Sequence, residues 1–292
     1  MTEPVCITIL MDNTAAAPSL SAEHGLSMWI QVGDKHLLWD TGQSDKLFDN
    51  AQQLGIDISK ADAVVLSHGH YDHTGGLLKV IQSAPDASFY LHPKAMDPKY
   101  SLKNDCRRFI GISRDTQLQL LKQDMAGRVI YVDRKTEIFS GVIVTGPVPR
   151  HTEYETTGGL FFIDAACESV DELNDDQSLY FNSTNGIIVV LGCAHSGVVN
   201  VLNAVSRWTG SSKIYAVIGG MHLVNADSAR IEKTIAAFKQ YDIQKIVPLH
   251  CTGTKAAQQL KQVFGNRCLS LGAGSQLCFT QTDPIKTEKI ND

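Results

Sequence analysis

An apolar run that ends in a dense group of histidines is the feature that most constrains this chain. The run "DAVVLS" covers residues 62–67 and is followed directly by His68, His70, Asp72 and His73. A run so uniformly apolar predicts a strand buried on both faces, as in folds where helices cover a sheet. Three imidazoles and a carboxylate would be costly to bury without partners, so the cluster predicts a bound metal ion.

The rest of the chain alternates strand and helix patterns, which predicts an α/β fold. Further strands are expected over 5–10, 26–32, 36–40, 88–92, 128–132, 142–146, 159–164, 177–182, 186–192, 213–219 and 245–250. Helices are expected over 44–55, 74–84, 113–123, 197–208, 228–241 and 254–265, with Ser113 as the N-cap of the third. Asn185-Gly186 predicts a hairpin turn. Since no linker or low-complexity tract divides the sequence, we expect residues 1–292 to form a single domain.

Three more histidines follow predicted strands in the last third of the chain. They are His195 in "LGCAHSG", His222 in "IGGMHL" and His250 in "PLHCTG". Because α/β folds place their sites in the loops at strand ends, we expect these side chains to meet the first cluster.

The four remaining isolated histidines are interpreted as surface or core residues. This group consists of His24, His36, His92 and His151. His24 and His151 are kept as weak candidates for substrate contacts, because they lie near "EHGLS" and "VPRHTE".

Charge and hydropathy argue against several functions. The net charge is −5, and Lys and Arg do not cluster with aromatic residues, which argues against nucleic-acid binding. The start "MTEPVCITIL" has no basic segment before its apolar run, and no apolar stretch reaches the length of a membrane span. We therefore expect a cytoplasmic protein with no membrane contact, whose oligomeric state the sequence leaves open.

Seven cysteines are scattered and never spaced as C-x-x-C, so neither a disulfide framework nor a cysteine zinc site is expected. Cys193 and Cys251 stand inside histidine motifs but are interpreted mainly as packing residues. No G-x-S-x-G elbow and no P-loop offers a competing catalytic group.

The stretch from His68 to His73 matches the pattern H-x-H-x-D-H and resembles the metallo-β-lactamase superfamily. The chain is similar above all to the branch related to 7,8-dihydropterin-6-yl-methyl-4-(β-D-ribofuranosyl)aminobenzene 5'-phosphate synthase. The motifs that carry this similarity are "EHGLS", "WDTGQS", "LSHGHYDHTGGL", "GCAHSGVVN", "GGMHL" and "HCTG". They span nearly the whole chain.

The resemblance implies a four-layer αββα sandwich with a mono- or dinuclear site at one edge. It implies a first ion bound by His68, His70 and His195. A second ion would be bound by Asp72, His73 and His250. Asp40 in "WDTG" would orient ligands, although a turn aspartate is the competing interpretation.

One position departs from the wider superfamily, in which an aspartate bridges the two ions. Met221-His222 stands there instead, and a neutral imidazole has one free lone pair, so His222 can bind one ion but cannot bridge two. Two divalent ions without that carboxylate would make the site more positive and favour an anionic substrate.

These residues predict an enzyme that uses one or two divalent transition-metal ions. Zn²⁺ fits the ligands best, and Mn²⁺, Ni²⁺ or Fe²⁺ fit as well. Asp72, His222 and Asp40 are the catalytic candidates. The expected substrate is a small anion bearing phosphate or pyrophosphate, acted on by hydrolysis or by a dihydropterin-type synthase (transferase) reaction. An iron-dependent oxidoreductase on the same fold and a non-catalytic metal-stabilised binding protein are the alternatives.

Overall fold

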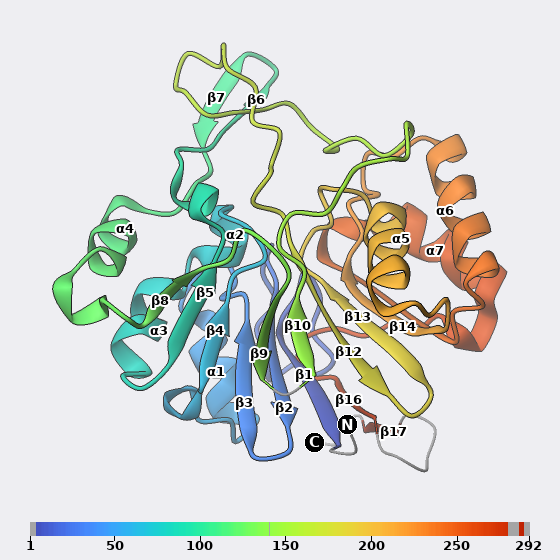
Figure 1. Ribbon diagram of the computed structural model, residues 1–292, viewed down its shortest axis with the longest axis horizontal. Coiled ribbons are helices and arrows are strands. Elements are labelled where there is room, and N and C mark those ends of the chain that lie inside the picture. The colour runs from blue at the N-terminus through green and yellow to red at the C-terminus, as the bar shows by residue number, and fades with distance from the viewer. Residues whose placement is uncertain (1–3, 140, 280–285, 289–292) are drawn as a thin grey trace.

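Two β-sheets lie face to face, and helices cover the outer face of each (Figure 1). The computed structural model describes residues 4–139, 141–279 and 286–288. The first sheet has the strand order β17-β16-β1-β2-β3-β4-β5-β8. Its strands are β1 (Val5–Met11), β2 (Ser27–Val32), β3 (Lys35–Trp39), β4 (Ala63–Val65), β5 (Ser88–Leu91), β8 (Val129–Tyr131), β16 (Gln276–Phe279) and β17 (Lys286–Glu288).

The second sheet has the order β15-β14-β13-β12-β10-β9. Its strands are β9 (Thr136–Phe139), β10 (Val142–Val144), β12 (Ser178–Ser183), β13 (Gly186–Leu191), β14 (Ile214–Gly220) and β15 (Lys245–Leu249). The pairs β13–β14 and β14–β15 are parallel, as are β3–β4 and β4–β5. Parallel neighbours end at the same edge, so the loops after β13, β14 and β15 lie at one edge of the second sheet, and those after β3, β4 and β5 lie at one edge of the first.

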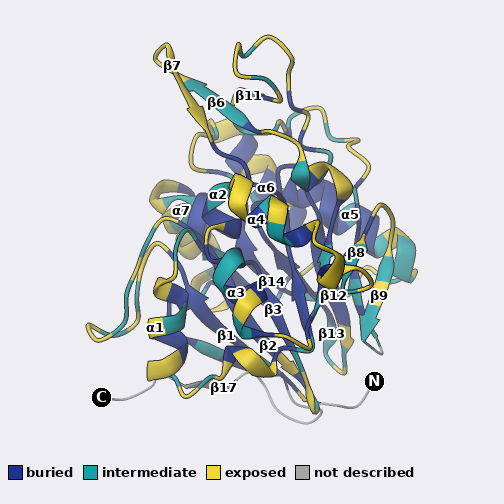
Figure 2. Cartoon of the chain, turned by 90° about the vertical axis from the view of Figure 1, so that its left-hand side faces the viewer, coloured by how far each residue is buried: buried dark blue, intermediate teal, exposed yellow. Residues whose placement is uncertain are grey.

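The outer layers consist of helices that pack on one sheet each. On the first sheet lie α1 (Lys46–Gln53), α3 (Leu77–Ser83) and α4 (Arg114–Leu120), and on the second lie α5 (Val198–Thr209), α6 (Ser228–Gln240) and α7 (Thr254–Phe264). Three apolar clusters fill the spaces between these layers. The central one joins both sheets through residues such as Ile7 and Phe181, and each outer one joins a sheet to its helices (Figure 2). This arrangement confirms the predicted αββα sandwich.

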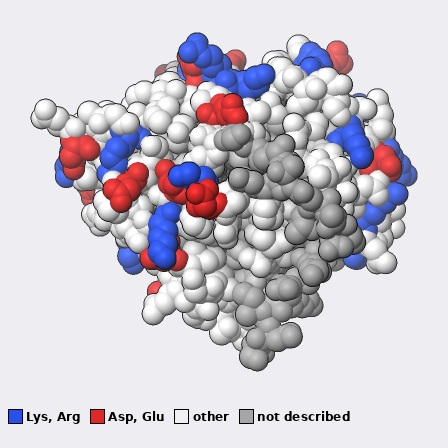
Figure 3. All heavy atoms as spheres, turned by 60° about the horizontal axis from the view of Figure 1, so that its bottom comes forward, with Lys and Arg blue, Asp and Glu red and all other residues white. Residues whose placement is uncertain are grey.

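A small third sheet projects beyond one end of the sandwich (Figure 1). It contains β6 (Tyr100–Lys103), β7 (Cys106–Phe109) and β11 (Phe161–Phe162) in the order β11-β6-β7. Figure 3 looks onto the opposite end of the sandwich, where acidic and basic side chains of the described residues lie next to each other at several places.

Most predicted elements are confirmed, including the Ser113 cap and the hairpin between β12 and β13, although Gly186 already pairs with Ser183 and the turn consists of residues 184 and 185. The strand expected over 159–164 is reduced to β11 (Phe161–Phe162), and β6, β7, β9, β16 and β17 had no predicted counterpart. The prediction of a single domain over 1–292 stays a prediction, and the residues outside the described ranges include the first three of the segment used to argue against export. Among the described residues, no helix has the length and apolar character needed to cross a membrane.

The expectation of no disulfide is wrong. Cys6 and Cys278 form a disulfide between β1 and β16. The two residues are 272 positions apart in sequence but directly opposite each other in an antiparallel pair, so their spacing gives no hint of the contact.

Candidate metal centre

The predicted histidine cluster folds as a short loop followed by one helical turn. His68 and His70 lie in the loop after β4, and Asp72 and His73 lie in α2 (Tyr71–Thr74). The turn is held because Thr74 Oγ1 donates to the His70 carbonyl at 3.0 Å. Gly69 allows the loop to pass close to its neighbours, since a Cβ at that position would lie 2.3 Å from the Ala95 carbonyl oxygen. The backbone of this loop and turn therefore fixes the positions of the Cα atoms from which the four side chains extend.

The side chains of His68, His70 and His195 meet in one buried group. His68 Nε2 lies 3.0 Å from His70 Nδ1. His195 donates through Nδ1 to the Thr157 carbonyl at 2.9 Å, assuming the tautomer that this acceptor requires, and its Nε2 is buried without a partner. Two ligand nitrogens of one tetrahedral zinc ion lie about 3.3 Å apart. The spacing of this group fits a shared ion.

Burial holds the pKa of each of these three imidazoles well below its usual range. Charging them is opposed both by desolvation and by the neighbouring histidines. All three are thus neutral at physiological pH, and each has a lone pair to offer. The unpartnered Nε2 of His195 in a polar, buried group is what a missing cation would leave behind.

A second group forms beside the first. His250 Nε2 lies 3.2 Å from Asp72 Oδ2 and 3.3 Å from His73 Nε2, which again fits the spacing of ligands around one ion. Burial opposes ionisation of Asp72, but hydrogen bonds from His24 and His250 outweigh it and hold the carboxyl pKa well below its usual range. The second group therefore contains a carboxylate.

His24 also reaches this group, although the sequence supported it only as a surface or core residue and as a weak candidate for substrate contacts. Its Nε2 lies 3.1 Å from Asp72 Oδ2, although the side chain is 53% exposed. Together His24, Asp72 and His250 form a set of donors close enough to hold a cation. His24 faces solvent, so it lies on the side from which a ligand would approach.

Asp40 supports both groups from behind. It is fully buried, and its Oδ2 accepts hydrogen bonds from His73 Nδ1 and from Ser67 Oγ, each at 2.7 Å. Ser67 Oγ in turn lies 2.9 Å from His68 Nδ1. This chain of bonds leaves Nε2 of both histidines free to accept, which fits the ligand-orienting role that the resemblance implies for Asp40.

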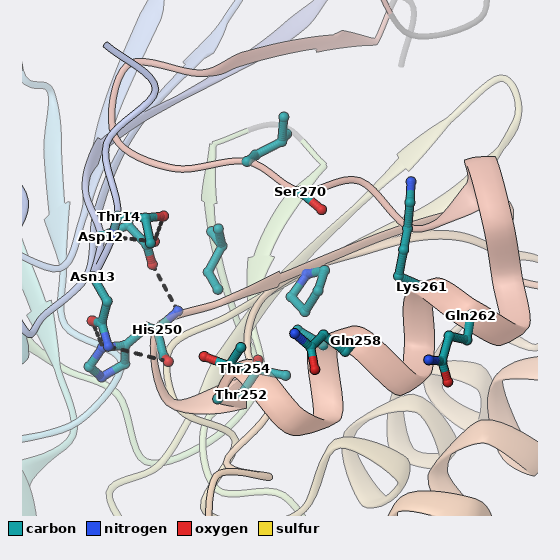
Figure 4. Close-up of a pocket in the computed structure, with 15 residues that line it drawn as sticks. Asp12, Asn13, Thr14, His250, Thr252, Thr254, Gln258, Lys261, Gln262 and Ser270 are labelled. Carbon is teal, nitrogen blue, oxygen red and sulfur yellow. Dashed lines mark hydrogen bonds between the residues drawn. The ribbon is translucent and has the colours of Figure 1, made fainter. Parts of the chain in front are cut away.

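His250 is fixed by the loop after β1. Its backbone N–H donates to Asp12 Oδ1 at 2.8 Å, and its Nδ1 lies 2.9 Å from Asn13 Oδ1 (Figure 4). The same residues line a hollow between this loop and α7. Asp12 and Asn13 were not among the predicted residues, because nothing in the sequence separates them from other polar loop residues.

His222 and two buried thiols complete the centre. Cys193, His195 and His222 form one possible ligand set, and the rings of His195 and His222 lie 4.2 Å apart. Cys193 Sγ is also 3.1 Å from His73 Nε2. Cys251 lies next to Cys193, and its thiol faces the Cys193 carbonyl oxygen at 3.6 Å. The two cysteines interpreted mainly as packing residues thus lie in groups that could hold a metal ion.

A cavity of about 740 Å³ opens onto both groups. The cavity is lined by residues of both groups and by residues of the small third sheet. Those of the two groups are His24, His70, Asp72, His195 and His250. Lys103 and Arg108 belong to the wall formed by the third sheet, and the Arg108 guanidinium lies over the Tyr71 ring at 4.6 Å. Among the described residues that line the cavity, Asp72 is the only carboxylate. The cavity thus combines a possible metal site with two cationic side chains.

A buried ion pair supports the loop that bears His68 and His70. Lys99 Nζ lies 2.9 Å from Asp171 and from Asp175, and Asp175 also accepts from the Gly69 N–H at 2.8 Å. Burial lowers the pKa of Lys99, but the two carboxylates outweigh burial and raise it above the ordinary 10.5. This network was not predicted.

The other isolated histidines lie elsewhere, as predicted. His36 stacks on Trp29 on the first sheet, and His92 caps a short turn by accepting from the Lys94 N–H. His151 is exposed. None of the three belongs to a possible metal-binding group among the described residues.

Comparisons with known proteins agree with this geometry. The family model described as "Metallo-beta-lactamase superfamily" matches residues 21–186. The chain is 30% identical over 277 residues to 7,8-dihydropterin-6-methyl-4-(beta-D-ribofuranosyl)-aminobenzene-5'-phosphate synthase of Methanocaldococcus jannaschii, covering 88% of this chain and 90% of the relative. It is 34% identical to an uncharacterized protein of the same organism, with coverage of 88% and 94%.

Among solved structures, the chain is similar to Tm1679, described as a metal-dependent hydrolase of the beta-lactamase superfamily. The TM-score is 0.78 at 32% identity, and the match covers 94% of this chain and 98% of that one. The similarity therefore extends over both sheets and the loops between them.

Proposed function

Because the chain belongs to the metallo-β-lactamase superfamily, we propose that it is an enzyme with two adjacent ion positions. His68, His70 and His195 form the first position. Asp72, His73 and His250 form the second. The observation that carries this proposal is the spacing of 3.0–3.3 Å between donor atoms of these residues in each group. Zn²⁺ suits these donors best, with Mn²⁺, Ni²⁺ or Fe²⁺ as alternatives.

A divalent ion at such a site lowers the pKa of bound water to about 7 and polarises a phosphoryl or carbonyl oxygen. The protein's own contribution is to orient the groups around the reacting atoms. Asp40 holds His73 and, through Ser67, His68 with their free nitrogens toward the cavity. Asp72 stays ionised between His24 and His250, where it can accept a proton or a hydrogen bond from a reactant. His222 borders the first position.

The proposed substrate is a small anion bearing phosphate or pyrophosphate. Lys103 and Arg108 support this class, since both line the cavity while Asp72 is its only described carboxylate. Tyr71 and Phe161 in the same wall offer apolar surface for a heteroaromatic group. Hydrolysis is the simplest reaction, and the synthase name of one relative supports transfer with loss of an anionic group as the second candidate.

The test begins with metal content and turnover of a phosphodiester probe such as bis(4-nitrophenyl) phosphate. We expect one to two bound ions per chain, activity that a chelator abolishes, and activity that added Zn²⁺ or Mn²⁺ restores. Less than half an ion per chain, with no activity restored by any of the four metals, would contradict the proposal. Bound iron together with oxygen consumption would instead identify an oxidoreductase.

The substrate class is tested by comparing Arg108→Met with Arg107→Met. The two residues are adjacent on β7, but Arg108 lines the cavity and Arg107 does not. We expect inhibition by pyrophosphate to weaken about tenfold in Arg108→Met, because a contact between two partly solvated charges is lost. We expect it to stay unchanged in Arg107→Met. Equal effects in both variants, or best turnover of an uncharged ester or lactam, would contradict an anionic substrate.

A further inference from the structure

One sulfur atom lies between the two proposed ion positions. Cys193 Sγ belongs to a possible ligand set with His68 and His73, which are assigned to different positions. It also belongs to one set with His195 and His222 and to another with His250 and Cys251. The donor atoms of each set lie within 4.8 Å of one another, so this sulfur is near donors of both positions.

The sulfur of Cys193 lies among possible ligand atoms of both proposed ion positions. A sulfur and a nitrogen that share a tetrahedral zinc ion are about 3.6 Å apart. Cys193 Sγ is 3.1 Å from His73 Nε2, within hydrogen-bond distance and somewhat closer than two ligands of one ion. Cys193 is buried, and the equally buried Nε2 of His195 in its set has no partner. A cation held between this unpartnered nitrogen and the thiol, which lie within 4.8 Å of each other, would satisfy both atoms.

The end of β14, beside Cys193, consists of glycines, so the side chain at this position comes from the loop after β13 instead. β14 ends in Gly219 and Gly220, so the strand end itself brings no carboxylate to the centre. A Cβ added at Gly220 would lie 2.6 Å from Cys251 Sγ and 3.4 Å from the Cys193 Cα. Larger residues are thus excluded at Gly220, and the two cysteines occupy the space beside it.

We propose that Cys193 is a metal ligand, bound as a thiolate at the junction of the two ion positions. The thiol proton passes to solvent when the ion binds, and the sulfur forms the metal bond in its place. The thiolate returns one negative charge, as the bridging carboxylate does in the wider superfamily. The centre is then no more positive than usual, and anion binding depends on Lys103 and Arg108 rather than on a missing aspartate.

This inference rests on the proposed metal centre, and cobalt substitution tests it separately. A cobalt–thiolate bond gives a charge-transfer absorption in the near ultraviolet, which nitrogen and oxygen ligands do not give. We expect this band in the Co²⁺-loaded protein and in Cys251→Ser, and we expect it to be lost in Cys193→Ser. Cys251 is the matched control because it is an adjacent, equally buried thiol. Metal affinity should fall at least about tenfold in Cys193→Ser and less in Cys251→Ser.

X-ray absorption of the unmutated zinc protein keeps the test independent of how Cys193→Ser folds. A sulfur neighbour at about 2.3 Å from zinc is expected, and it should persist in Cys251→Ser. Ions with nitrogen and oxygen neighbours alone would overturn the inference while leaving the proposed function intact. A band or sulfur neighbour that disappears in Cys251→Ser but not in Cys193→Ser would overturn it too. A protein that binds no metal at all would instead contradict the proposed function.

Discussion

Replacing Asp40 by Asn tests whether one buried carboxylate sets the proton positions on the ligands of both ions. In the structure, Oδ1 of Asp40 accepts from the Ser67 N–H, and Oδ2 accepts from Ser67 Oγ and from His73 Nδ1, all at 2.7 Å. Asn has almost the same shape. It also tolerates the left-handed backbone at this position, where φ is 56°. The fold should therefore persist while the hydrogen bonding changes.

An amide cannot serve three donors, because one of its two terminal groups donates. With the NH₂ group in the place of Oδ2, His73 Nδ1 must become an acceptor, and the ring proton moves to Nε2. A protonated Nε2 has no lone pair for an ion. The ring proton of His68 also moves to Nε2 if the Ser67 hydroxyl donates to His68 Nδ1 instead of to the side chain at position 40. The loss of such partners typically weakens metal binding about 10–100-fold, or about 1.4–2.8 kcal/mol.

Competition with a chromophoric chelator at neutral pH measures the affinity for each ion. Asp176→Asn is the matched control: Asp176 is equally buried, and its Oδ2 accepts from the Ser196 N–H and Oγ, while its Oδ1 has no partner among the described residues. An amide oxygen in the place of Oδ2 keeps both bonds to Ser196. If Asp40→Asn bound metal as tightly as the unchanged protein, or if both variants lost affinity equally, the tautomer argument would be refuted.

Three further changes test other parts of the structure. His195→Ala should lose the first ion while the exposed His151→Ala keeps full occupancy, as measured by elemental analysis after dialysis. Lys99→Met should lower the free energy of unfolding by about 3–5 kcal/mol in urea titrations, since two buried carboxylates lose their partner. Because the folded pKa of Lys99 is raised above 10.5, its contribution is complete below about pH 10.5 and is lost as the pH rises through the folded value; Lys99→Met should lack this alkaline loss. His24→Gln should weaken binding of the second ion by less than tenfold, because this half-exposed ring contacts the site only through Asp72. An unchanged affinity would show that the contact between His24 and Asp72 does not contribute to ion binding.

The layers of the fold could be predicted because burial leaves a strong trace in sequence. β4 is apolar at every position since it is covered on both faces, and α5 repeats apolar residues along the face that packs on the second sheet. β6 and β7 left no such trace. They are short, polar and mostly exposed, so their strand character comes from pairing with each other rather than from a buried face.

The candidate site was predictable to the extent that its residues cluster in sequence or end a strand. His68 to His73 meet both conditions and His250 ends a strand, whereas His24, Asp12 and Asn13 lie in irregular loops near the start of the chain. These three reach the centre because β1 and β2 pair in the first sheet while β15 ends beside them. Such contacts depend on how the two sheets pack, which local patterns do not determine.

The same dependence on packing links the proposed chemistry to folding. His68 and His73 follow β4 in the first sheet, whereas His195 and His250 follow β13 and β15 in the second. Each proposed ion therefore takes ligands from both sheets, and neither sheet alone brings a complete set together. An ion that binds these ligands must stabilise the packing of one sheet on the other, because it binds the folded arrangement and not the separated one. The central apolar cluster brings the sheets together, and the ions then oppose the separation that would open the centre.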